Sequence, residues 1–254
     1  MKMTLKEVQE CCTEMLGEVV SLCEKNNVPY FMFYGSLIGT IRHQGSIPWD
    51  SDVDIAVPEC NQAAFMKAME QLPDKYWVDF RQTGAYPRCF ARIGLKGYDT
   101  YWLHIDVYRL MGYSGNTIRN RIISNYGHLL IRMRLVKTVD ESVYFGMKKI
   151  VVKVLKILLK PISITHIIKS FDKLCTKYPF DSAPYVGTQD GIHWIIPKRC
   201  VEGYEVKQYE NLSVRVPKGY DEALTLWYGN YMTPPDDNYV QQALKHEYEI
   251  KVLT

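Results

Sequence analysis

The sequence has no cysteine spacing typical of a metal site. Of its seven cysteines, Cys11 and Cys12 are adjacent and the others are scattered without a C-x-x-C pair, whereas a zinc site or a disulfide framework needs a more regular, clustered spacing. We therefore expect reduced, structural thiols in a cytoplasmic protein. The first residues, MKMTLKEVQECC, are polar and lack the apolar centre of a signal peptide. Internal repeats and low-complexity tracts are also missing.

A strong overall charge is missing too, although the charge is unevenly distributed. The 254 residues carry a net charge of +3, and 47% of them are apolar and 23% charged, as in an ordinary folded protein. Residues 119–173 contain twelve Lys or Arg and three acids, a net charge of +9, which leaves −6 for the rest. One segment is therefore strongly basic.

The basic segment contains no long uninterrupted apolar run. Lys149, Lys153, Lys156 and Lys160 recur every three or four residues, among Ile, Leu and Val. These lysines exclude a transmembrane span, which needs about 20 apolar residues with few charges. Two interpretations stay open: a core helix with lysines directed outward, or contact of residues 148–160 with an anionic membrane surface, at the inner face of the membrane. Without interleaved aromatic residues to stack on bases, we expect no nucleic-acid binding.

The hydrophobic periodicity predicts helices mixed with short strands. The predicted strands are residues 30–34, 53–57, 88–95 and 102–110. The predicted helices are residues 4–25, 37–42, 61–72, several within 118–178, and 221–227. This order is typical of a mixed α/β sheet. We predict a core at 1–115, a basic helical segment at 116–180, and strands and a helix at 181–254 that complete the same domain.

Acidic residues gather in the stretch YGSLIGTIRHQGSIPWDSDVDIAV, residues 34–57. Asp52 and Asp54 lie two apart at the start of a predicted strand, so their side chains share a face. Asp50 is expected just outside, in the approach loop. Because three nearby carboxylates repel one another, we expect a cation to compensate them.

A second pair of chemically active residues lies on a later predicted strand. His104 and Asp106 in HIDVY also share one face. If this strand neighbours residues 53–57 in the sheet, Asp106 completes a cluster with Asp52 and Asp54. Carboxylate oxygens without thiols suit Mg²⁺ or Mn²⁺.

The Gly35-Ser36 pair precedes the acids and fits a phosphate. Glycine lets the backbone approach a ligand closely, and the N–H groups that open a helix, together with the Ser36 hydroxyl, favour an anion. The order of these features resembles the nucleotidyltransferase fold of the DNA polymerase β type. In that order, a strand is followed by Gly-Ser, then by Asp-x-Asp at the start of a second strand, and later by an Asp on a further strand.

Within that superfamily, the stretch resembles the core motif of the LicD family, whose relatives include fukutin and the fukutin-related protein. Ser51 departs from the Asp of many bacterial members. HIDVY and YENLSVRVPKGYDEALTLWYGNYMTPP resemble later segments of the family, so the resemblance covers roughly residues 28–110 and 193–235. The positions that match the core motif are Gly35, Ser36, Leu37, Ile38, Gly39, Arg42, His43, Ile47, Pro48, Trp49, Asp50, Asp52 and Asp54.

The resemblance implies a nucleotidyltransferase-like mixed sheet with flanking helices and an inserted basic helical segment. It also implies a transferase that moves a phosphorylated alcohol, phosphocholine above all, from a CDP-linked donor to a glycan hydroxyl and releases CMP. In bacteria the donor is typically CDP-choline and the acceptor a cell-surface glycan precursor, such as that of lipopolysaccharide, teichoic acid or capsule. In the fukutin branch the donor is CDP-ribitol.

The resemblance also assigns roles to individual residues. Asp52, Asp54 and Asp106 are expected to hold the metal, and either Asp106 or His104 to accept the acceptor's proton. Residues expected to contact the donor's phosphates are Gly35, Ser36, Arg42, His43 and Arg92. For Arg92 a surface ion pair remains the alternative.

Aromatic faces bind a quaternary ammonium such as that of choline well. Trp227, Tyr228 and Tyr231 are candidates for this contact, with packing in the core as the alternative.

Two other functions fit the same residues. A nucleotidyltransferase would transfer NMP from an NTP to a small molecule or sugar and release pyrophosphate instead of CMP. A glycan-assembly subunit would keep a vestigial site, which the cost of uncompensated acids argues against.

Overall fold

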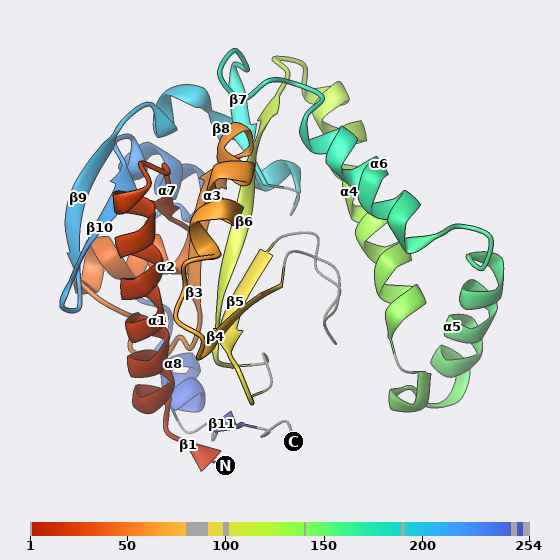
Figure 1. Ribbon diagram of the computed structural model, residues 1–254, viewed down its shortest axis with the longest axis horizontal. Helices are drawn as coiled ribbons and strands as arrows, with labels where there is room; N and C mark the ends of the chain where they lie inside the picture. Colours follow the sequence, from red (N-terminus) through yellow and green to blue (C-terminus); the bar gives the residue numbers. More distant parts are fainter. Residues whose placement is uncertain are drawn as a thin grey trace.

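The computed structural model is built on a mixed β-sheet (Figure 1). It describes residues 2–79, 91–98, 102–139, 141–188, 191–244 and 248–250. Within these ranges the strand order is β2–β3–β6–β5–β4, with β7 paired to β6 and β8 to β7. The pair β3–β6 is parallel and the others are antiparallel. The strands are β2 (Phe31–Met32), β3 (Val53–Pro58), β4 (Tyr76–Asp79), β5 (Ala91–Leu95), β6 (His104–Tyr113), β7 (Tyr185–Gly187) and β8 (Ile196–Pro197).

The two central strands confirm the prediction for residues 53–57 and 102–110. Every residue of β3 and β6 is buried, so both faces of the sheet are covered there. The predicted strand at 88–95 begins at Ala91 in the structure, since residues 88–90 lie outside the described ranges. The predicted strand at 30–34 is shorter, because Tyr34 already begins a helix.

Helices flank the sheet on both sides. The long helix α1 (Leu5–Lys25) begins with a capping box between Thr4 and Glu7, and its apolar face is buried. Both α1 and α3 (Gln62–Met69) pack against β3. In Figure 1 they lie in front of the sheet, whereas α2 (Tyr34–Ile38) and α7 (Tyr220–Tyr228) lie behind it.

The remaining elements of the C-terminal part extend this arrangement. Strands β9 (Tyr204–Tyr209) and β10 (Leu212–Pro217) form an antiparallel hairpin. Helix α8 (Asp237–Leu244) follows α7, and β1 (Lys2–Met3) pairs with β11 (Tyr248–Glu249). The fold class predicted from the sequence, a mixed α/β sheet with flanking helices, is therefore confirmed. The nucleotidyltransferase-like topology stays a prediction.

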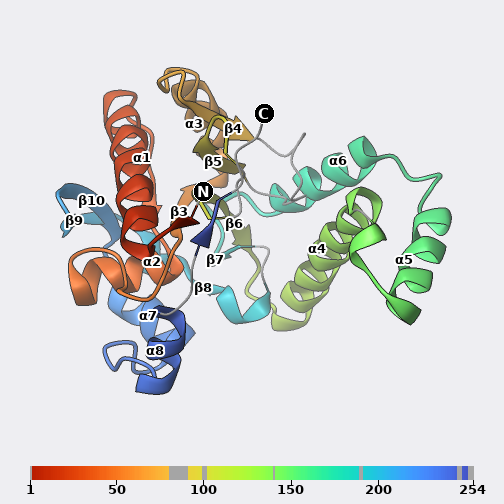
Figure 2. The same cartoon turned by 90° about the horizontal axis from the view of Figure 1, so that it is seen from below.

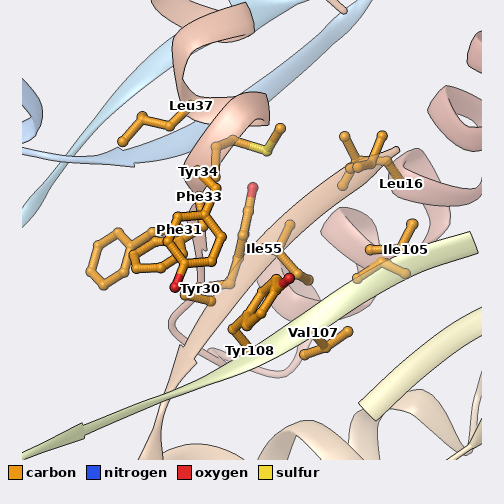
Figure 3. Close-up of a cluster of buried hydrophobic side chains, with 14 of the residues drawn as sticks. Leu16, Tyr30, Phe31, Phe33, Tyr34, Leu37, Ile55, Ile105, Val107 and Tyr108 are labelled. Carbon is orange, nitrogen blue, oxygen red and sulfur yellow. The ribbon is translucent and has the colours of Figure 1, made fainter. Parts of the chain in front are cut away.

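Three helices lie apart from α1, at the opposite side of the molecule (Figure 2). They are α4 (Thr117–Thr138), α5 (Gly146–Leu158) and α6 (Ile164–Cys175). A small core joins Met111 and Tyr113 of β6 to Ile123 and Leu130 of α4 and to Phe171 of α6. The larger core surrounds β2, β3 and the first half of β6, with Phe33, Tyr34 and Tyr108 clustered together (Figure 3). The division at 1–115, 116–180 and 181–254 stays a prediction.

Helix α5 corrects one sequence interpretation. A core helix would bury most of its Ile, Leu and Val side chains, but no residue of α5 is buried. Among the described helices, none is both long enough and apolar enough to cross a membrane. The apolar side chains of α5 therefore lie on the surface.

Candidate active site

The chain between β2 and β3 forms a tight helical turn that carries most of the sequence motif. Tyr34 opens α2 with φ at +42°, and α2 continues into one π-helical turn, Gly39–His43. A Cβ on Gly39 would lie 2.5 Å from the Gly45 carbonyl oxygen, so only glycine fits there. π-Helical turns are rare and frequently mark functional sites.

The sheet brings Asp54 beside Asp106, as the sequence predicts. The two residues are directly in register on the parallel strands β3 and β6. The backbone N–H of Asp54 donates to Ser36 Oγ at 2.8 Å. Ser36 is buried, and in this structure its hydroxyl links α2 to the strand that carries the acid. The predicted contact of Ser36 with a phosphate stays a prediction.

Asp106 is engaged by basic side chains rather than open to a ligand. Arg92 donates from Nε and Nη2 to the two Asp106 oxygens at 2.7 and 3.0 Å, and His104 Nε2 lies 3.7 Å from Oδ2. Burial alone would raise the pKa of Asp106, but the hydrogen bonds from His104 and Arg92 hold it well below its usual range. Because Asp106 is only 2% exposed and Arg92 only 6%, the surface ion pair considered for Arg92 is instead a buried one.

A cavity of about 690 Å³ opens beside the turn, and three acids line it. They are Asp50, Asp52 and Asp54; Asp106, His104 and Arg92 do not line it. Asp50, which the sequence placed outside the cluster, is thus the third acid on the wall. The signal that would have found Asp50 is the D-x-D-x-D spacing itself.

The Asp50 carboxyl is held in a confined position. A Cβ on Gly35 would lie 2.9 Å from Asp50 Oδ2, so the glycine leaves room for the acid. Gln9 of α1 donates to the Asp50 carbonyl at 2.7 Å and fixes the loop. Burial, together with a hydrogen bond to Asp52 and its charge, raises the pKa of Asp50 to about 8. Acids crowded together in this way are typical of a site whose negative charge awaits a counterion.

The predicted metal site is not preassembled. Among the described residues, no group of three or more His, Cys, Asp or Glu is already arranged to hold a metal ion. The donor type nevertheless fits a hard divalent cation, because Asp50, Asp52 and Asp54 present carboxylate oxygens to one cavity. A cation there would have to draw these side chains together.

Arg42 lines the cavity, and its sequence neighbour His43 does not. Arg42 donates from Nη1 to the Tyr231 carbonyl at 2.6 Å and stacks over Trp49 at 5.6 Å. His43 packs edge-on against Trp49, with ring centroids 5.8 Å apart. Arg42 is therefore available to a ligand in the cavity, while His43 supports Trp49.

Aromatic side chains form another part of the cavity wall, which we call the aromatic wall: Tyr34, Trp194 and Tyr228. The Tyr34 and Trp194 ring centroids lie 4.5 Å apart, and those of Trp194 and Tyr228 lie 5.6 Å apart. Burial, followed by the charges of the three cavity acids, raises the pKa of Tyr228. Of the aromatic candidates from the sequence, Tyr228 and Tyr231 line the cavity and Trp227 packs behind it. No sequence signal pointed to Trp194, which is far from the motif along the chain.

Comparison with known proteins agrees with the motif. The family model described as LicD/FKTN/FKRP, nucleotidyltransferase domain, matches residues 27–148. The lipopolysaccharide cholinephosphotransferase LicD of Haemophilus influenzae is 26% identical over 267 aligned positions, which cover 97% of this chain and 98% of that protein. The human ribitol 5-phosphate transferase FKRP is 43% identical over 51 residues, 18% of this chain and 10% of that protein. An uncharacterised protein of Rickettsia prowazekii is 25% identical over 136 residues, 52% of this chain and 48% of that protein.

Proposed function

The chain belongs to the LicD family, and from that premise we propose that it is a metal-dependent transferase that moves phosphocholine from CDP-choline to a hydroxyl of a cell-surface glycan or its lipid-linked precursor. The observation that carries the proposal is a single cavity lined by both three carboxylates and several aromatic side chains. Such a cavity can hold a diphosphate with its counterions at the carboxylates and a quaternary ammonium against the rings.

The cavity acids would act on the donor's phosphates through a bound cation. Asp52 and Asp54, with Asp50 beside them, would hold Mg²⁺ or Mn²⁺, which when bound neutralises charge on the phosphoryl oxygens. Gly35 leaves the backbone open to the cavity, and Arg42 offers a guanidinium at its entrance. These residues orient the donor so that its distal phosphorus faces the acceptor.

The reaction is a displacement at that phosphorus. The acceptor hydroxyl forms a new P–O bond, the bond to the bridging oxygen breaks, and CMP leaves with the electron pair. A general base must come within hydrogen-bond distance of the hydroxyl. Because His104 and Asp106 do not line the cavity, we assign the proton to one of the cavity carboxylates instead.

The aromatic wall favours choline over a polyol. Tyr34, Trp194 and Tyr228 present rings to the cavity, and aromatic rings attract a trimethylammonium group but offer a ribitol chain few hydrogen-bond partners. This wall is the feature that supports phosphocholine as the transferred group.

A donor panel tests the proposal. The protein is incubated with Mg²⁺ and, in turn, CDP-choline, CDP-ribitol, CDP-glycerol or an NTP, and thermal stabilisation, CMP and pyrophosphate are measured. We expect CDP-choline to stabilise the protein most and to yield CMP. Pyrophosphate release from an NTP would instead support the nucleotidyltransferase alternative, and preference for CDP-ribitol would refute choline specificity.

Trp194→Leu separates the aromatic wall from the chemistry. We expect the KM for CDP-choline to rise roughly ten-fold, with kcat little changed, because the lost contact is with a group that does not react. Tyr204→Leu is the matched control, since Tyr204 is exposed and does not line the cavity. An unchanged KM in Trp194→Leu would rule out this wall as the choline site.

A further inference from the structure

Helix α5 turns its apolar side outward. Met147 is 74% exposed and Ile157 is 71% exposed, and Phe145, just before the helix, is 84% exposed. Ile150, Val151, Val154 and Leu158 lie on the same side and are also exposed. We call this set, Met147, Ile150, Val151, Val154, Ile157 and Leu158, the outer face of α5. Exposed apolar surface of this extent on one helix marks an interaction site.

The orientation of α5 is fixed by its opposite side. The half-buried residues there are Lys149, Val152, Lys156 and Leu159. Lys156 Nζ donates to the Val139 carbonyl at 2.7 Å, and Lys137 Nζ of α4 donates to the Leu159 carbonyl, also at 2.7 Å. The lysine stripe predicted from the sequence is therefore split, because Lys156 faces α4 and Lys149 is half-buried, whereas Lys153 and Lys160 are exposed.

The exposed lysines flank the outer face. Lys148 lies at one edge of it, and Lys153 and Lys160 lie toward the other. The sequence has no Asp or Glu between Glu141 and Asp172, so helix α5 carries no acid of its own. An apolar stripe bordered by lysines matches the pattern of a helix that lies in the interface plane of a membrane.

We propose that the outer face of α5 binds the surface of a bilayer that contains anionic lipids. The apolar side chains would enter the boundary between headgroups and acyl chains, and the flanking lysines would meet lipid phosphates. A second copy of this chain is a poorer occupant, because it would bring one lysine-bordered face against another with no acids to pair them. Figure 2 shows α5 at the edge of the molecule far from α1, where a flat surface can reach it.

This proposal does not depend on the transferase activity. Vesicle binding can be measured by cosedimentation without a substrate, so it can fail while the proposed function holds, and the reverse is also true. The probes are vesicles of pure phosphatidylcholine and vesicles of equal parts phosphatidylcholine and phosphatidylglycerol.

The charge test uses the full chain with Lys148→Glu, Lys153→Glu and Lys160→Glu combined. We expect the unaltered protein to sediment with the mixed vesicles and not with pure phosphatidylcholine, and the triple variant to bind them about a hundred-fold more weakly. Lys156 is left in place because it holds α5 against α4. The matched control combines Lys67→Glu, Lys96→Glu and Lys218→Glu, which are exposed lysines outside the helix and change the net charge equally. Equal loss in both triple variants would overturn the proposal.

The apolar test combines Ile150→Asn and Ile157→Asn, which leaves every charge in place. We expect this variant to lose vesicle binding while its circular dichroism spectrum and thermal midpoint stay unchanged, because both side chains are exposed. If the unaltered protein does not cosediment with the mixed vesicles, the proposal is contradicted. So does a dimer in sedimentation velocity that the same substitutions dissociate, since the outer face would then join two copies of the chain.

Discussion

At the scale of single residues, the candidate site depends on how each acid is compensated. Asp106 has Arg92 and His104 against its carboxyl, so its charge is already balanced inside the protein. Asp50 and Asp52 both line the cavity, where burial and the neighbouring Asp52 raise the pKa of Asp50. Carboxylates balanced by a basic side chain stabilise the fold, whereas carboxylates that crowd together in a cavity are suited to bind a cation.

Asp52→Asn and Asp54→Asn test this distinction. Each variant should lower CMP release from CDP-choline at least about a hundred-fold, because each removes a carboxylate that would stabilise charge in the transition state. Asp52 is exposed, so its substitution should leave the thermal midpoint unchanged. Asp181→Asn, an exposed acid away from the cavity, is the control and should keep full activity. Full activity of Asp52→Asn at saturating Mg²⁺ would contradict the metal assignment.

At the scale of secondary-structure elements, the turn from β2 to β3 positions the acids. The π-helical turn is closed by a backbone hydrogen bond from Gly45 N–H to the Gly39 carbonyl at 3.3 Å. The Ser36 hydroxyl and the Phe33 N–H both bond to Asp54 backbone atoms. The acid-bearing strand and the turn therefore behave as one unit, and a disturbance of the turn should reach the acids.

Gly39→Ala tests the closeness of this packing. The added Cβ would lie 2.5 Å from a backbone oxygen that cannot rotate away, so we expect a loss of about 1–3 kcal/mol in the free energy of unfolding. Urea denaturation measures this loss. Gly115→Ala is the matched control, since its Cβ would meet nothing closer than 3.9 Å, and it should change stability by less than about 0.5 kcal/mol. Equal stability of both variants would show that the turn tolerates a side chain.

At the scale of the whole molecule, one arginine joins the sheet to the helical segment. Arg109 of β6 donates from Nε and Nη2 to Glu59 at 2.7 and 2.6 Å, and from Nη1 to Asp172 of α6 at 2.5 Å. Burial alone would lower the pKa of Arg109, but these hydrogen bonds keep it raised and the guanidinium charged. The side chain thus couples α6, and through it α4 and α5, to the sheet.

Arg109→Leu should loosen that coupling. We expect a loss of about 3 kcal/mol in the free energy of unfolding. Most of this loss would come from Glu59, which is left buried without its arginine partner, because Asp172 is partly exposed to water. Hydrogen exchange should accelerate in α6 more than in α1. Arg199→Leu, which breaks an exposed pair with Glu222, is the control and should have little effect. If the hydrogen-exchange rates of α6 were the same in the unaltered protein and in the variant, the coupling would be refuted.

The amino-acid sequence alone determined the features that depend only on residues close together along the chain. The apolar spacing along residues 4–25 gave α1, because a helix repeats its faces every three or four residues. The alternation of a strand put Asp52 and Asp54 on one side. The sequence predicted that Gly35 lets a phosphate approach the backbone, and in the structure the glycine leaves room for the Asp50 carboxyl.

Only the tertiary structure decided which distant groups meet those residues. Strand register put Arg92 against Asp106, so the third cavity acid is Asp50 and not Asp106. Chain folding brought Trp194 against Tyr34 in the cavity wall. The orientation of α5 likewise follows from the contact of Lys156 with Val139. Each of these is a contact between residues far apart along the chain, and sequence periodicity carries no information about which such partners come together.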